Sequence, residues 1–269
     1  LKLATLIESQ DLQHLGWGSG GALRDISVSF WFRSPKTGIH NVYIYQTSAA
    51  AGGAGRSMVK EFSVAVANTY EFFSLTFAAD SGGGFSNVTT QGLELGFPIV
   101  CSTSLQATAD TWTSGNKYCT SNVQNLADST ANDIYVADVQ LECGPSTDFD
   151  YLPYGTTLAR CQRYFWRQID GNVQLLPNLV QSHASSAGYG PVEFPVQMRA
   201  TPTLAYSDLA HFQLDVVGSN PTPSAMSIQY GSVRSGYLEV TWSSAGSDGD
   251  GVRAYSIHAS ATVDWSSEL

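Results

Sequence analysis

Charged residues are scarce in this sequence, and basic residues are the scarcer kind. Asp, Glu, Lys and Arg make up 13% of the 269 residues, and 13 basic side chains stand against 23 acidic ones, which gives a formal net charge of −10. Nucleic-acid binding depends on a basic surface that neutralises phosphates. We therefore expect no nucleic-acid partner.

Long hydrophobic runs are also missing. None approaches the roughly 20 residues that span a bilayer, so we expect no membrane insertion. The sequence has only four Cys, and none of them has the CxxC spacing of a zinc site. Cys101 and Cys119 flank a polar stretch and can close it as a disulfide, and four free thiols are the alternative.

Catalytic motifs are the third absence. The five His are scattered along the chain, and no GxSxG nucleophile motif accompanies them. A pair of glycosidase carboxylates is a spatial arrangement that spacing along strands does not reveal. We expect that the protein is not an enzyme and that it needs no cofactor, a structural calcium ion being the one possible exception.

Period-two alternation of apolar and polar residues is present almost everywhere, with turn-forming clusters between the segments. This pattern is typical of β-strands in sandwiches. It predicts an N-terminal core that contains Val28, Phe30, Phe32, Phe73 and Leu75. In the C-terminal part, the same pattern predicts strands in four segments and a loop over residues 178–190; the segments are 192–198, 212–216, 238–242 and 255–259.

The segment from Val139 to Arg167 (VQLECGPSTDFDYLPYGTTLARCQRYFWR) divides these two parts. A predicted strand over Ile134–Glu142 stops at the following Cys-Gly-Pro turn. Thr156 or Thr157 can cap a helix that runs to Arg163. The expected architecture is all-β: an N-terminal jelly-roll sandwich (residues 1–155), then a short connecting helix and a C-terminal antiparallel β-sandwich (residues 156–269).

The same segment resembles the hinge of phage tail fibres and other virion appendages, in which a jelly roll ending in "VQLE" leads through "YGxxLxxCQRYxxR" into a second β domain. Four further segments are similar to this family, in the same order: Glu8–Gly18, Ile26–Gly38, Asn68–Phe77 and Asn125–Tyr135. The resemblance covers about residues 1–167. Beyond them, only Phe194–Leu204 is similar.

This resemblance implies a structural or adhesive role on a virion. The expected function is a tail-fibre or receptor-binding segment that contacts host-surface glycans, and the partners are other virion proteins and further copies of the chain. A capsid-bound head fibre or collar component is one alternative, and an accessory carbohydrate-binding module of a polysaccharide-degrading enzyme is another. Assembly in the reducing host cytoplasm favours free thiols for all four Cys.

Sugar binding is chemically plausible, because aromatic faces stack on the C–H faces of sugars and Asn, Gln and Asp side chains hydrogen-bond their hydroxyls. Five aromatic residues lie in predicted loops or on strand faces opposite the core pattern, and each can instead pack under a loop or at a subunit contact; they are Trp17, Trp31, Tyr43, Tyr45 and Trp112. Related carbohydrate-binding jelly rolls hold calcium with an acidic residue on their last strand. That resemblance implies a metal role for Asp138, with Glu8 as partner, whereas the alternative places Asp138 on a solvent-facing surface.

Self-assembly is the last expectation. Fibres of this family project as threefold bundles, so the resemblance implies a homotrimer. Low charge and outward aromatics such as Trp31, Tyr43 and Trp166 agree with a buried contact between copies. The interface is expected at the connecting helix and the strand after it, and a tethered monomer is the alternative.

Overall fold

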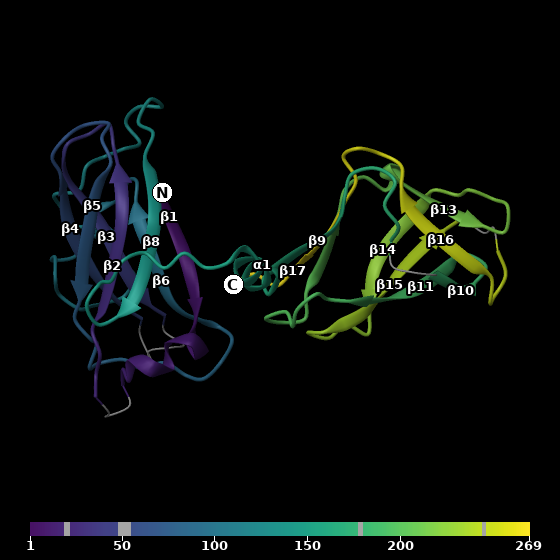
Figure 1. Ribbon diagram of the computed structural model, residues 1–269, viewed down its shortest axis with the longest axis horizontal. Helices are drawn as coiled ribbons and strands as arrows, with labels where there is room; N and C mark the ends of the chain where they lie inside the picture. The colour runs from purple at the N-terminus through teal and green to yellow at the C-terminus, as the bar shows by residue number, and fades with distance from the viewer. Residues whose placement is uncertain (19–21, 48–54, 177–179, 244–245) are drawn as a thin grey trace. The chain divides into compact units, whose positions relative to one another are not determined.

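A computed structural model describes residues 1–18, 22–47, 55–176, 180–243 and 246–269. The described chain is nearly all β and divides into two compact units, Leu1–Tyr151 and Leu152–Glu268 (Figure 1). The all-β class predicted from the alternation is confirmed.

The N-terminal unit is built from two antiparallel sheets. One has the strand order β1-β6-β3-β4-β7 and the other β5-β2-β8. Its strands are β1 (Lys2–Glu8), β2 (Ile26–Arg33), β3 (Gly38–Gln46), β4 (Arg56–Val64), β5 (Glu71–Phe77), β6 (Gln91–Pro98), β7 (Thr113–Ser114) and β8 (Tyr135–Cys143), with 3-10 turns η1 (Ser9–Leu15) and η2 (Thr103–Leu105).

The C-terminal unit is a second two-sheet structure. Its sheets have the orders β13-β16-β10-β11-β15-β14 and β12-β17-β9. Its elements are α1 (Tyr154–Gln162), β9 (Phe165–Asp170), β10 (Val180–Ala184), β11 (Ala187–Glu193), β12 (Thr203–Tyr206), η3 (Leu209–His211), β13 (Phe212–Val216), β14 (Pro223–Gln229), β15 (Ser235–Trp242), β16 (Gly251–Ser256) and β17 (Thr262–Ser266).

The core of the N-terminal unit lies between its two sheets. Val28, Phe30 and Phe32 of β2 are fully buried there, and Phe73 and Leu75 of β5 pack against them from the neighbouring strand. The predicted core is therefore confirmed, because period-two alternation places every second side chain of a strand on one face.

The C-terminal core differs from the prediction in two places. Tyr255 and Ile257 do not face inward. The buried residues of β16 are Val252, Ala254 and Ser256, one position out of phase. A one-residue shift moves every side chain of a strand to the other face. Trp166, expected on the outside, packs against this core, at 6.0 Å from Phe194.

The predicted loop over residues 178–190 is also wrong where the structure describes it. Residues 180–184 and 187–193 form the antiparallel pair β10–β11, with a register shift at its turn. Asn178 and Leu179 lie outside the described residues. Small residues such as Gly188 and Gly190 suggest a loop by composition, but both lie in a strand that pairs with β15 along its full length.

The connecting helix α1 begins at Tyr154, before both of the predicted caps, Thr156 and Thr157, and Pro153 occupies the cap position. The amides of Thr156 and Thr157 donate to the carbonyl of Pro153 (3.0 and 3.1 Å), whose extended conformation ends the preceding segment. None of the residues of α1 is buried, and Leu158 is 39% exposed. The apolar side chains of Leu158 and Cys161 on this helix are therefore not buried within the C-terminal unit.

Cys101 and Cys119 form a disulfide, while Cys143 and Cys161 are free thiols. The expectation of four free thiols is therefore wrong for the first pair. An isolated parallel bridge also joins Gln106 to Cys119, so the chain on either side of the disulfide is paired.

Candidate functional site

An exposed row of aromatic side chains crosses the outer surface of the β5-β2-β8 sheet in the N-terminal unit. Trp31 of β2 pairs in register with Phe72 of β5 on one side and with Ala137 of β8 on the other. Cross-strand partners share a face, so Trp31 and Phe72 lie side by side, with ring centroids 5.4 Å apart. They are 40% and 51% exposed, which leaves large ring surfaces open to solvent.

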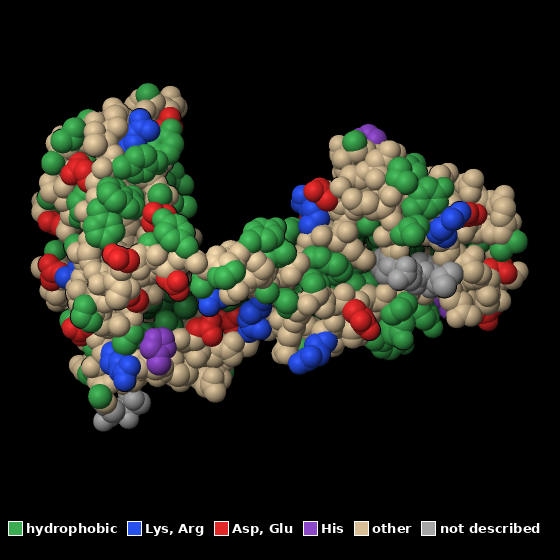
Figure 2. Space-filling model, viewed as in Figure 1, with side chains coloured by type: hydrophobic (Ala, Val, Ile, Leu, Met, Phe, Trp, Pro, Cys, Tyr) green, Lys and Arg blue, Asp and Glu red, His purple; other side chains and the backbone are tan. Residues whose placement is uncertain are grey.

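A second row lies two residues further along these strands. Arg33 of β2 pairs with Tyr135, and its guanidinium lies 4.9 Å from the Tyr135 ring centroid and 6.0 Å from that of Tyr70. The Arg33 Nε donates to the carbonyl of Asn68 (3.0 Å), which fixes the side chain in place. We call Trp31, Phe72, Tyr70, Tyr135 and Arg33 together the aromatic face. Figure 2 shows hydrophobic side chains gathered over β2, β5 and β8.

The other half of this sheet surface is covered by the chain itself. Residues 144–150, which follow β8, fold back over it: Thr147 N donates to Glu142 (2.7 Å) and Asp150 N donates to Gln140 (2.8 Å). Burial alone would raise the pKa of Glu142, but the hydrogen bonds from Gln140 and Thr147 outweigh it and lower that pKa. The segment after β8 thus covers the polar half of this sheet surface, and the aromatic half remains exposed to solvent.

The aromatic face has the chemistry of a sugar-stacking surface. Indole and phenyl rings present flat apolar surfaces that match the C–H faces of pyranose rings, and a guanidinium at the rim can donate to hydroxyl or carboxylate oxygens. No described group of three or more His, Cys, Asp and Glu gathers near it or elsewhere in the parts of the chain that the structure describes. The surface can therefore bind and orient a ligand.

Trp17 and Trp112, both expected to meet glycans, have a packing role instead. Trp17 is only 3% exposed, and its Nε1 donates to the carbonyl of Arg24 (2.8 Å). Trp112 packs edge-on against it at 5.4 Å and donates to the carbonyl of Ala78 (2.9 Å). The two indoles close the end of the core beneath loops, because a buried Trp needs a partner for its N–H.

Tyr43 and Tyr45 project from β3 onto the outer surface of the five-stranded sheet, but the chain covers them. Tyr43 is fully buried beneath Tyr118, at a centroid distance of 4.7 Å, and its hydroxyl donates to Glu94. Burial, with Tyr118 and Glu94 nearby, raises the pKa of Tyr45, whose ring lies against Gly55. Neither ring is a free sugar platform in this structure.

The predicted metal pair is not brought together with further ligands. Glu8 ends β1 and is fully buried, with its Oε2 accepting from Gln10 Nε2 (2.9 Å). Asp138 lies at a bulge of β8, where its φ is 47°, a conformation that Asp tolerates better than most residues. The bulge and its left-handed conformation thus explain why the charged residue Asp138 occurs in the middle of a strand. Among the described residues, no group of three or more His, Cys, Asp and Glu that could hold a metal ion gathers around either residue.

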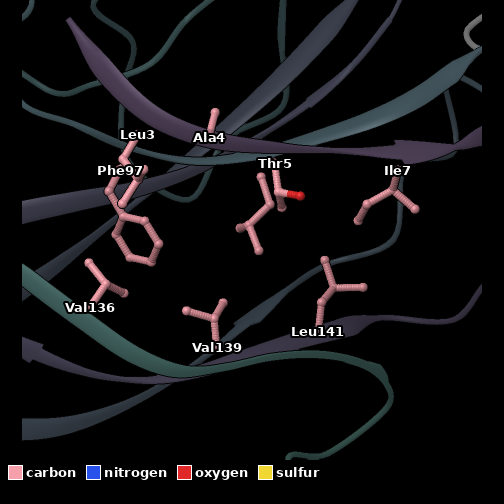
Figure 3. A pocket seen from close by; sticks show the side chains of 9 residues that line it. Leu3, Ala4, Thr5, Ile7, Phe97, Val136, Val139 and Leu141 are labelled. Carbon is pink, nitrogen blue, oxygen red and sulfur yellow. The ribbon is translucent and has the colours of Figure 1, made fainter. Parts of the chain in front are cut away.

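An apolar crevice opens between the edge strands β1 and β8 (Figure 3). Leu3, Thr5 and Ile7 point into it from β1, opposite Val139 and Leu141 of β8. Its volume is about 420 Å³, and Leu3 is 51% exposed. Each of these strands pairs on one side only, so the crevice marks the open side of the sandwich.

Sequence reasoning identified Trp31 but missed its neighbours Phe72, Tyr70, Tyr135 and Arg33. The signal for Phe72 was present, since it alternates with the core residues Phe73 and Leu75. What was missing was the strand pairing, because β8 joins β2 from more than a hundred residues further along the chain.

No known protein family, no curated protein and no solved structure matches this chain. Within the described residues, no helix is long and apolar enough to cross a membrane.

Proposed function

We propose that this chain is a non-enzymatic segment of a virion appendage, of the tail-fibre or receptor-binding kind, and that its aromatic face contacts host-surface glycans. The observation that carries the proposal is the open row of Trp31 and Phe72 beside the Arg33–Tyr135 pair, on a surface whose polar half the chain itself closes. Exposed apolar surface of this kind, rimmed by polar groups, is typical of binding sites.

One further feature supports the setting on a virion: the hinge segment from Val139 to Arg167 resembles that of virion appendages. The Cys101–Cys119 disulfide differs from the free thiols expected for assembly in reducing cytoplasm, so it does not add to this support.

Self-assembly is part of the proposal. Leu158 and Cys161 on α1 and the crevice between β1 and β8 offer apolar surface of the kind that a second and third copy would cover. Light scattering on the purified chain tests this: a trimer mass supports the proposal, and a monomer mass at micromolar concentration contradicts it.

The glycan proposal is tested by replacing Trp31 with Ala. Removing the indole takes away the stacking surface, and we expect binding to host-cell polysaccharide, measured by biolayer interferometry, to fall at least tenfold. Tyr206→Ala is the matched control, because this tyrosine of β12 is similarly exposed (36%) but belongs to the C-terminal unit. Equal losses in both variants, or no loss in Trp31→Ala, would contradict the assignment to the aromatic face.

A further inference from the structure

A polar hollow of about 540 Å³ lies over β4, on the sheet opposite the aromatic face. Two arms of the chain form its walls: residues 106–109 lead away from Cys101, and residues 120–122 follow Cys119. Glu61 of β4 also lines it. The hollow is thus made from three separate parts of the sequence.

The two arms are fixed against each other. The Cys101–Cys119 disulfide joins them, Tyr118 N donates to the carbonyl of Leu105 (2.9 Å), and Ala107 N donates to the carbonyl of Cys119 (2.9 Å). Thr120, which is only 4% exposed, also donates from its backbone N to Asn41 Oδ1 (2.8 Å) of β3. The walls are therefore preorganised by covalent and hydrogen bonds, which lowers the entropy lost when a ligand binds.

Glu61 is held with one oxygen occupied. Its Oε1 accepts from Thr120 Oγ1 (2.5 Å) and from Asn122 Nδ2 (3.0 Å). No described residue donates a hydrogen bond to its Oε2. A fixed carboxylate with one open oxygen is a strong acceptor for a ligand hydroxyl.

The lining selects against ions. No Lys or Arg lines the hollow, so an anion would meet only Glu61, which carries the same sign of charge. A calcium ion would need several carboxylates, and the described residues hold no group of three or more acidic, His or Cys side chains. The remaining lining offers the amides of Gln106 and Asn122 and the hydroxyls of Thr108 and Ser121.

We propose that this hollow binds a single neutral sugar residue, with Glu61 accepting from its hydroxyls and the amide and hydroxyl side chains completing the contacts. The volume falls within the range of ligand pockets, roughly 300–1,000 Å³. This site is separate from the aromatic face, and it stands whether or not that face binds glycan.

The test uses the full chain labelled for NMR and titrated with the methyl glycosides of glucose, galactose, mannose and N-acetylglucosamine. We expect at least one of them to give saturable shifts at residues 106–109 and 120–122. Calcium chloride is titrated in parallel. Shifts from calcium alone, or from none of these probes, would overturn the proposal.

Three variants sharpen the result. Ser121→Trp fills the hollow from an exposed position and is expected to abolish the shifts, whereas Glu61→Gln keeps the shape and is expected to weaken binding about tenfold. Trp31→Ala should leave this binding unchanged, which separates this site from the aromatic face. Undiminished binding by Ser121→Trp, with its circular dichroism unaltered, would refute the location.

Discussion

The two units are both antiparallel β structures, but they bury different chemistry. In the N-terminal unit, the buried side chains include Glu8, Asp80, Glu94 and His40. In the described part of the C-terminal unit, the buried polar side chains are all serines, namely Ser182, Ser256 and Ser267. One unit thus encloses ionisable groups and the other does not.

The partners of the buried ionisable groups explain this difference. Asp80 accepts from Arg56 Nε (2.6 Å), and Glu94 is bonded to both Tyr43 and Lys2. A buried charge persists only when it is paired and hydrogen-bonded. These groups connect loops and edge strands to the sheets, so the stability of the N-terminal unit should depend on pH. The Cys101–Cys119 disulfide should make its stability depend on redox state as well. The stability of the C-terminal unit should depend mainly on packing.

Truncating the C-terminal core should have the largest effect and should leave the N-terminal unit intact. Trp265 is fully buried, and its Nε1 donates to Gln168 (2.9 Å), so Trp265→Ala is expected to destabilise this unit by about 3–5 kcal/mol. Calorimetry should show one transition lowered and the other unchanged. If both transitions moved together, the two units would not be independent.

Opening the disulfide should destabilise only the N-terminal unit. The bridge closes a loop with a sequence separation of 18, and its loss is expected to cost about 2–4 kcal/mol. Thermal melts of the Cys101→Ser/Cys119→Ser double variant measure the effect. Cys161→Ser, at an exposed thiol of the other unit, is the control that should melt like the parent.

Removing the Tyr43 hydroxyl should destabilise the N-terminal unit less than loss of the disulfide does, because it breaks one bond of the buried network around Glu94. Tyr43→Phe takes away the donor to Glu94 and leaves a buried carboxylate with one partner fewer, at a cost of about 1–3 kcal/mol. Tyr70→Phe, at an exposed ring, should change stability little. Urea denaturation of both variants would show the contrast, and equal midpoints would argue that the network adds nothing.

The smallest expected effect is a dependence on mildly acidic pH. Burial lowers the pKa of His40 below its ordinary value of 6.5, although its contact with the Lys36 carbonyl opposes the shift. As the pH falls, the unfolded chain therefore binds a proton at His40 at a higher pH than the folded chain does. The contribution of neutral His40 to the free energy of unfolding is fully present above pH 6.5 and is lost as the pH drops toward the lowered pKa. Melting curves between about pH 7 and 5 should show this loss in the parent and less of it in His40→Gln.

The sequence alone was enough for the fold class and for the cores of the better-patterned strands. Phe30 and Leu238 reveal their faces through alternation with polar neighbours. The phase of β16 could not be read, because Val252 to Ile257 mixes small, aromatic and polar residues on both faces. Strand β17, which carries the fully buried Trp265, has only Val263 and Trp265 in alternation, whereas the equally long β13 has the three apolar residues Phe212, Leu214 and Val216.

The candidate site was only partly predictable. Exposure of Trp31 followed from its place opposite Phe30 and Phe32. The burial of Tyr43 could not be foreseen, because it follows from the segment around Tyr118 that folds back over the sheet. Alternation shows which face of a strand a side chain occupies, but not what covers that face.

The order of strands in the N-terminal unit has a consequence for its synthesis on the ribosome. Strand β2 lies at the centre of its sheet, yet one of its two partners is β8, whose end pairs Cys143 with Ile26. The sheet cannot be completed until residue 143 has left the exit tunnel, and such distant pairings fold slowly. The row of Trp31 and Phe72 would meanwhile stay without its third strand, and the edge of β2 that faces β8 would stay unpaired during synthesis.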